Sequence, residues 1–191
     1  MVALPTSTLE WHSFFPPEAP SFHVYSDASG SFGCGAYSPE LSSWFQLSWP
    51  QSWSTVSISA KELVSIVMAA AIWGHHWSGS HVCFHCDNDA VVVVIQNRNA
   101  HQDLLVQLLR CLFFYASRFQ FHFSALHIPG VHNVVADAIS RDNISLLSSF
   151  VPQAQQVSVP APVVAFLLSP PNWGSPDWIT QFVHSLSMAC P

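Results

Sequence analysis

Four acidic residues stand where the sequence predicts that regular elements begin or end. Asp27 closes an alternating stretch, and Glu62 opens a long helical pattern. Asp87 follows a short apolar stretch, and Asp137 lies inside a predicted short helix. Ends of neighbouring strands and the helix starts beside them lie along one edge of an α/β sheet, so the four carboxylates can meet. Mg²⁺ prefers hard oxygen ligands of this kind, so the pattern predicts a centre for two divalent cations.

Each acid also has an ordinary structural explanation. Asp27 suits a turn before a Ser-Gly pair, and Glu62 suits the reciprocal partner of Ser59 in a capping box. Asp87 suits the cap of the helix that follows it, and Asp137 suits a solvated helical position. Taken singly, these explanations stay open. The joint placement of the four acids favours the metal centre.

The amino-acid composition and net charge limit the kinds of protein that this chain can be. The 191 residues are 50% apolar, which is enough for one domain with a real core. Only 8% are charged, and 5 Lys+Arg against 11 Asp+Glu give a net charge of −6. This balance argues against holding nucleic acid by bulk electrostatics. No signal peptide is visible, and no apolar stretch reaches the ~18 residues of a membrane span. We expect an intracellular protein, cytoplasmic or nuclear, that is not secreted and has no membrane partner.

The 5 cysteines are odd in number and scattered, unlike a secreted disulfide framework. Cys83 and Cys86 lie three residues apart on a predicted strand, so their side chains face opposite sides of the sheet. This spacing argues against a zinc site shared by the two thiols.

Hydrophobic periodicity divides the chain into elements. A period of two predicts strands, and a period near 3.6 predicts amphipathic helices. The segment 90–95 is ambiguous, because its β-branched run favours a strand while the preceding Asn and Asp suit a helix start; we interpret it as helix. The order β-β-β-α-β-α-α-β-α predicts a mixed sheet with helices packed on it. The predicted elements are strands at 22–27, 33–37, 44–49, 81–86 and 119–125, and helices from Ser59 toward Trp77, at 90–95, at 102–117 and from Asn133.

The domain organisation follows from the composition. Residues 1–21 are rich in Pro and Ser, which predicts an N-terminal linker. Residues 22–142 carry the periodic patterns and form the predicted domain. Residues 143–191 read as a linker and tail, ending in an aromatic cluster at 173–182 that resembles the start of a truncated following domain.

Four short segments occur in the same order as the motifs of a known protein family. They are Tyr25–Ser29, Ser59–Leu63, Cys86–Asn88 and His127–Arg141. Together they resemble the ribonuclease H domain of retrotransposon reverse transcriptases, most of all those of gypsy-type and DIRS-type elements. The resemblance covers about residues 22–141, and the last segment is the most specific.

The resemblance implies an α/β fold with a ribonuclease H-like mixed five-stranded sheet, in the order 3-2-1-4-5, and helices packed on it. It implies an endonuclease that hydrolyses the RNA strand of RNA/DNA hybrids by two-metal-ion catalysis, as part of a reverse transcriptase polyprotein. A polymerase domain in cis or in trans would then be a partner. The cofactor would be two Mg²⁺ ions, with Mn²⁺ as a substitute.

Residue roles carry over only where the motifs match. Asp27 would bridge both ions, and Asp137 would share the ion that activates water. Glu62 and Asp87 would hold the other ion. Glu62 would also sense the ribose 2′-OH, which distinguishes RNA from DNA.

A histidine before the last acid assists proton transfer or product release in some family members. His127, ten residues before Asp137, is our choice, and His132 is the alternative. The expected substrate-binding residues are Ser29, Asn88, Asn133 and Arg141.

Two other functions stay open at this point. One is a catalytically idle retroelement fragment or nucleic-acid-binding remnant, which the scarcity of Lys and Arg favours. The other is a DNA-cutting ribonuclease H-like nuclease, because one fold serves several chemistries. The intact acids favour the hybrid nuclease, and the motif from Asn133 to Arg141 favours the retroelement type.

Overall fold

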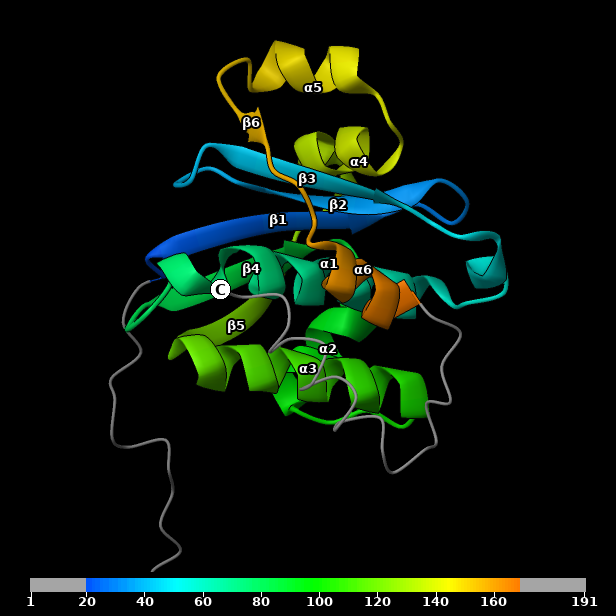
Figure 1. The fold of residues 1–191 in the computed structure, drawn as a ribbon, viewed down its shortest axis with the longest axis vertical. Helices are drawn as coiled ribbons and strands as arrows, with labels where there is room; N and C mark the ends of the chain where they lie inside the picture. Colours follow the sequence, from blue (N-terminus) through cyan, green and yellow to red (C-terminus); the bar gives the residue numbers. More distant parts are fainter. Residues whose placement is uncertain (1–19, 169–191) are drawn as a thin grey trace, which may run out of the picture.

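The computed structural model describes residues 20–168, which form a mixed sheet with helices on both faces (Figure 1). Residues 1–19 of the predicted linker at 1–21, and the tail from residue 169 with its aromatic cluster, lie outside the described residues. The strands are β1 (Phe22–Ala28), β2 (Gly33–Ser38), β3 (Ser43–Ser48), β4 (His81–Cys86), β5 (His122–His127) and β6 (Gln155–Gln156). The α-helices are α1 (Ile58–Trp73), α2 (Asp89–Asn97), α3 (Asp103–Phe119), α4 (Val134–Ser140), α5 (Ile144–Phe150) and α6 (Ala161–Leu168).

The strand order across the sheet is β5-β4-β1-β2-β3-β6. The predicted order 3-2-1-4-5 is therefore confirmed, with β6 added beside β3. Strands β1, β2 and β3 form the predicted antiparallel meander, while β4 runs parallel to β1 and β5 runs parallel to β4. Because β1, β4 and β5 are parallel, their C-terminal ends reach the same edge of the sheet.

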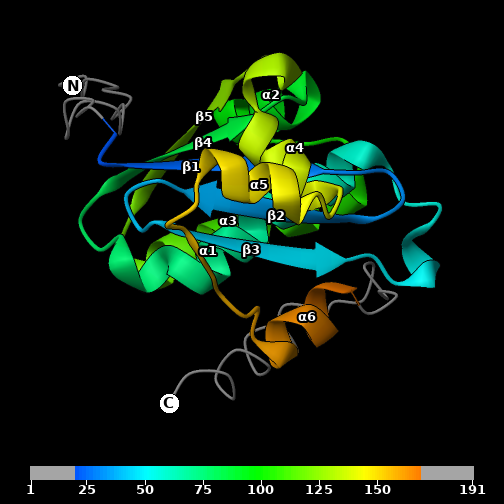
Figure 2. The same ribbon diagram turned by 90° about the horizontal axis from the view of Figure 1, so that it is seen from above.

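Helices cover the two faces of the sheet unequally. Helix α1 contacts β1 and β2 on one face of the sheet and packs against α3. Helix α4 contacts β1, β2 and β3 on the opposite face, and α5 packs against α4 (Figures 1 and 2). Helix α1 is apolar nearly all round, as expected for a helix enclosed between a sheet and another helix. The main core lies on this side, around Val24, Ile66, Phe84 and Leu108.

Helix α1 begins two residues earlier than the capping box predicted. Its N-cap is Ser57, whose side chain accepts a hydrogen bond from the amide of Ala60 at 3.4 Å. The prediction of Ser59 as the cap was therefore wrong. The helix ends at Trp73, short of the predicted Trp77, and a 3-10 turn follows it.

Strand β5 begins at His122 and not at residue 119 as predicted. Helix α3 continues to Phe119, and Gln120 ends it in the left-handed conformation with a φ of 56°. The alternating aromatic residues Phe119, Phe121 and Phe123 therefore span the end of α3 and the start of β5. Segment 90–95 lies inside α2, so its interpretation as helix is confirmed, and Asn88 caps it.

The segment from residue 143, predicted to be a linker, contains regular structure. Helix α5 places Leu147 in a small cluster with Trp44 and Ile139, and β6 pairs with β3 in parallel. A two-residue strand and a seven-residue helix are too short to show a hydrophobic period, so the sequence pattern does not reveal them. No helix among residues 20–168 is both long and apolar enough to cross a membrane.

The glycine at position 35 permits the close approach of α4 to the sheet. A Cβ atom on Gly35 would lie 2.1 Å from Cγ2 of Ile139 and 2.5 Å from the carbonyl oxygen of Phe45. The second contact is with backbone, which has no rotamer by which to move away.

We therefore expect Gly35→Ala to lower the free energy of unfolding by about 1–3 kcal/mol through overpacking. Thermal unfolding of the purified chain measures it. Gly30→Ala is the matched control, because a Cβ there would meet nothing within 4 Å. Equal unfolding temperatures for the two variants would show that α4 does not sit this close to β2.

Candidate metal centre

The edge formed by the C-terminal ends of β1 and β4 carries the candidate site. Asp27 lies in the last residues of β1, and Asp87 directly follows β4. Helix α1 brings Glu62 to this edge from one face of the sheet, and α4 brings Asp137 from the other. The structure thus brings the four predicted acids together from four elements.

Hydrogen bonds fix the orientation of the two most buried acids. The amide of Ala28 donates to Oε1 of Glu62 at 3.1 Å, and the hydroxyl of Ser140 donates to Oδ2 of Asp27. Glu62 is 3% exposed and Asp27 is 5% exposed. Neither carboxylate can turn to solvent without breaking its contact.

Burial and mutual repulsion make these carboxyl groups weak acids in the absence of a cation. Burial, followed by the charges of Asp27 and Asp87, raises the pKa of Glu62 to about 9. Burial raises the pKa of Asp27 to about 6; the Ser140 hydrogen bond opposes this shift, and the charges of Asp87 and Asp137 add to it. Asp27 thus lies close to Asp87 and Asp137, and Glu62 lies close to Asp27 and Asp87.

The other two acids are more accessible to solvent. Arg141 donates from Nε to Oδ1 of Asp137 at 2.5 Å, one helical turn away. Asp87 lies against the loop after β5, where a Cβ on Gly130 would be 3.1 Å from its Oδ2. Two buried and two accessible carboxylates form a site that opens toward solvent.

The donor set fits hard divalent cations. Potential ligand atoms of Glu62, Cys86 and Asp87 lie within 4.8 Å of one another. Burial, and then Glu62, raise the pKa of the Cys86 thiol, so the thiol stays protonated and donates to Oε2 of Glu62 at 3.7 Å. The ligands that remain are carboxylate oxygens, which Mg²⁺ and Mn²⁺ prefer to thiolate.

The ordinary explanations for three of the acids do not match the structure. Glu62 bonds to Ala28 and not to the start of its own helix. Asn88, and not Asp87, caps α2 by accepting from the amide of Val91 at 3.3 Å. Asp27 is buried in a strand, and the turn after it is held by Ser29. For Asp137, the solvated helical position with an Arg141 partner remains compatible with what is seen.

The four expected substrate-binding residues have structural partners. Ser29 bonds within its own turn to Phe32 and Gly33, and the Asn88 side chain caps α2. Asn133 donates from Nδ2 to the carbonyl of Ser26 at 2.9 Å and is 1% exposed, which docks α4 onto β1. Arg141 is the exposed member and pairs with Asp137. Substrate binding by these residues stays a prediction.

Both candidate histidines lie near the same edge. His127 ends β5 opposite Cys86 of β4, so it lies beside Asp87. Its Nε2 is 3.7 Å from Oδ1 of Asp89, and its side chain is 40% exposed. His132 is exposed in the 3-10 turn before α4. His127 thus has an acidic neighbour, and its catalytic role stays a prediction.

Three further residues support the site but were not predicted. Ser140 holds Asp27, and the Cys86 thiol holds Glu62. Lys61 is buried, donates to the carbonyl of Gly30 and lies 5.7 Å above the ring of Trp49. Ser140 follows Asp137 by three residues, so the helical period places it on the same face as that acid and would have revealed it. No comparable signal marks Lys61 or Cys86.

A solved structure shares this fold. LC11 ribonuclease H1, in complex with RNA/DNA hybrid, aligns with a TM-score of 0.51 and 15% identity over 65% of this chain and 99% of that chain. At this identity the likeness establishes the fold alone, and the chain has a ribonuclease H-like fold. No protein-family model matches the sequence, and no curated protein matches it.

Two ribonuclease H structures align less closely. The N-terminal ribonuclease H domain of Rv2228c from Mycobacterium tuberculosis, fused to maltose-binding protein, has a TM-score of 0.46 and 17% identity over 63% of this chain and 96% of that chain. Ribonuclease H1 from the halophilic archaeon Halobacterium salinarum has a TM-score of 0.48 and 12% identity over 65% of this chain and 97% of that chain.

The raised pKa values predict a pH-dependent stability in the absence of metal. Between the ordinary value of 4.5 and about 9, folded Glu62 keeps a proton that the unfolded chain loses. Stability is therefore lost as pH rises through this window, and Asp27 adds the same effect between 3.8 and about 6. We expect the unfolding temperature in EDTA to fall from pH 5 to pH 9.

Glu62→Gln should flatten this fall, and added Mg²⁺ should reduce it in the wild-type chain. The unfolding temperature measured across the pH range, with and without Mg²⁺, tests both expectations. If the unfolding temperature of Glu62→Gln decreased with pH as steeply as that of the wild-type chain, a group other than Glu62 would be the cause.

Proposed function

We propose that this chain is a metal-dependent endonuclease that hydrolyses the RNA strand of RNA/DNA hybrids. The observation that carries the proposal is the meeting of Asp27, Glu62, Asp87 and Asp137 at one sheet edge, where burial and the neighbouring carboxylates raise the pKa values of Asp27 and Glu62. Buried carboxylates that repel one another are unfavourable unless cations neutralise them. A ribonuclease H-like fold around them adds support for a nuclease.

The four carboxylates are the proposed ligands of two Mg²⁺ ions, with Mn²⁺ as a substitute. Such ions, when bound, lower the pKa of an attacking water and stabilise the leaving oxygen of the displacement. Ser140 keeps Asp27 in place, and the Ala28 amide keeps Glu62 in place. Glu62 is the proposed contact of the ribose 2′-OH, which would confine cleavage to RNA.

The sequence motifs support a retroelement origin. On this proposal the domain belongs to a reverse transcriptase polyprotein of the gypsy or DIRS type, and a polymerase domain delivers the hybrid. The low content of Lys and Arg favours such delivery, because few phosphate contacts are available on the domain itself. An intracellular site of action, cytoplasmic or nuclear, would follow from that role.

We expect cleavage of a labelled RNA/DNA hybrid in Mg²⁺ or Mn²⁺, and none in EDTA. Ca²⁺ should not support turnover, because its looser coordination misplaces the water. Asp27→Asn should lower kcat by at least about 10³-fold, because Asp27 is the proposed ligand of both ions. Gel analysis of single-turnover reactions measures each rate.

Asp103→Asn is the matched control, since Asp103 is exposed in the first turn of α3 and is not one of the four acids. Parallel reactions on double-stranded DNA and on single-stranded RNA separate the alternatives. Metal-dependent cutting of DNA duplex alone would favour the DNA-cutting relative. A folded chain that cuts nothing in Mg²⁺ or Mn²⁺ would favour the idle remnant.

His127 is proposed to move a proton or to assist product release. His127→Ala should lower kcat by about 10- to 100-fold without abolishing cleavage, the effect of losing one proton-transfer group. His122→Ala is the control, because this exposed histidine stands at the opposite end of the same strand. An unchanged rate in His127→Ala together with a slow His132→Ala would transfer the role to His132.

A further inference from the structure

A second group of metal-ligating side chains lies on the sheet, outside the acidic edge. It consists of His23 on β1 and of Cys83 and His85 on β4. In the parallel pairing of these strands, His23 is opposite Cys83 and Tyr25 is opposite His85. Cys83 and His85 are two residues apart on one strand, so the period of two directs both to the same face. Strand register alone therefore places the three side chains together.

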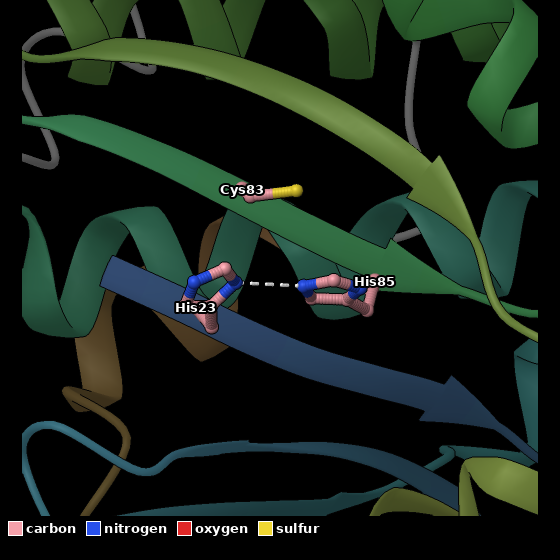
Figure 3. A group of neighbouring side chains, drawn as sticks. All are labelled: His23, Cys83 and His85. Atoms are coloured by element: carbon pink, nitrogen blue, oxygen red, sulfur yellow. Dashed lines mark hydrogen bonds between the residues drawn. The ribbon is translucent and has the colours of Figure 1, made fainter. Parts of the chain in front are cut away.

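The nitrogens and the sulfur are close enough to share one ion. Nδ1 of His23 lies 2.9 Å from Nε2 of His85, and the ligand atoms of all three residues lie within 4.8 Å of one another. Figure 3 shows the two imidazole rings facing each other, with Cys83 on the strand that carries His85. Cys83 is fully buried, while both histidines are partly accessible. An ion can therefore reach the group from solvent on the histidine side.

Neighbouring residues hold the ligands in place. The ring of Tyr25 stacks on that of His85, with centroids 4.5 Å apart and an angle of 10° between the planes. The backbone amide of His23 donates to Oε2 of Glu40 at 3.1 Å, which places a carboxylate beside the group. The imidazole of His85 is thus restrained before any ion binds, which lowers the entropic cost of coordination.

We propose that His23, Cys83 and His85 form a binding site for Zn²⁺, with the fourth tetrahedral position left to water. Two imidazoles and one thiolate are a ligand set that zinc uses in proteins, and three protein ligands leave a position open. On binding, the Cys83 thiol releases its proton to solvent. The imidazole that donates the hydrogen bond moves its proton to its other ring nitrogen by exchange with solvent, so that both facing nitrogens offer lone pairs to the ion. The site links β1 to β4 by coordination.

This site is separate from the acidic edge in position and in chemistry. His23 precedes Asp27 by four residues on the same strand, a separation of about 13 Å at the rise of an extended chain. Cys86, the thiol near the acids, faces the other side of β4 from Cys83. Mg²⁺ prefers oxygen ligands, so it does not compete for two nitrogens and a sulfur.

Co²⁺ is the probe, because it takes zinc sites and shows a sulfur-to-cobalt charge-transfer band in the near ultraviolet when a thiolate binds it. The reduced full-length chain, carrying Cys190→Ser to remove the cysteine outside the described residues, is titrated with Co²⁺ in excess Mg²⁺. We expect the band to grow to one equivalent and to disappear when Zn²⁺ is added. No band in a chain that circular dichroism shows to be folded would overturn the proposal.

The variants identify the ligands. Cys83→Ser should abolish the band, and His85→Ala should weaken Co²⁺ binding at least about 100-fold, because each removes one of three ligands. Cys86→Ser and Cys111→Ser are matched controls that should keep the band, since both are buried thiols outside the proposed site. Loss of the band in Cys86→Ser with retention in Cys83→Ser would assign the ion to the acidic edge and reject this site.

His23→Gln provides a second route if Cys83→Ser fails to fold, because His23 is partly exposed and the change keeps a polar side chain. It should weaken Co²⁺ binding by a similar factor. Zn²⁺ should also raise the unfolding temperature of the wild-type chain by several degrees, and this rise should vanish in His23→Gln. A rise of equal size in His23→Gln would show that zinc acts elsewhere and that the two histidines form a hydrogen-bonded pair only.

Discussion

The docking of α4 onto β1 is the contact on which the acidic edge depends. Asn133 ties the start of the helix to the carbonyl of Ser26, and Ser140 ties its end to the carboxylate of Asp27. Asp137 lies between these two anchors and is thereby held near other negative charges. Packing and hydrogen bonds elsewhere in the fold must offset this repulsion, because burial strengthens it. The helix is short, so few contacts are available to hold it.

Alternation and strand pairing made much of the fold predictable. Strands β1 and β2 match the predicted segments through their period of two, whereas β4 was identified as a short apolar run between turn and polar residues, as its nearly complete burial explains. Helix α2 was identified despite its β-branched residues, because Asn88 signals the start of a helix more strongly than Val signals a strand. The resemblance in sequence motifs supplied the strand order, which local patterns cannot supply. The four acids could be singled out as candidates because each stands at the end of an element or on a short helix.

Other features escaped prediction because they depend on contacts between distant residues. Ser57 and Ser59 are chemically equivalent, and only the backbone conformation makes Ser57 the cap. The burial of Lys61 depends on the carbonyl of Gly30 and the ring of Trp49, which the fold brings to it. Pairing of His23 with His85 depends on the register of β1 and β4, which an alternating pattern leaves open by steps of two residues. The sequence therefore identified single reactive residues more readily than their partners.

The pairing of β6 with β3 has a consequence for the behaviour of the isolated domain. An unpaired edge strand exposes a row of amide and carbonyl groups that another chain can bind, and this is a common start of aggregation. Strand β6 covers Ser43 and Trp44 of β3, and α5 shields the neighbouring face through Leu147. A chain that ended at residue 142 would keep all four acids but leave this edge bare. The segment after Asn143 thus protects part of the β3 edge and also packs against α4, the helix that carries Asp137.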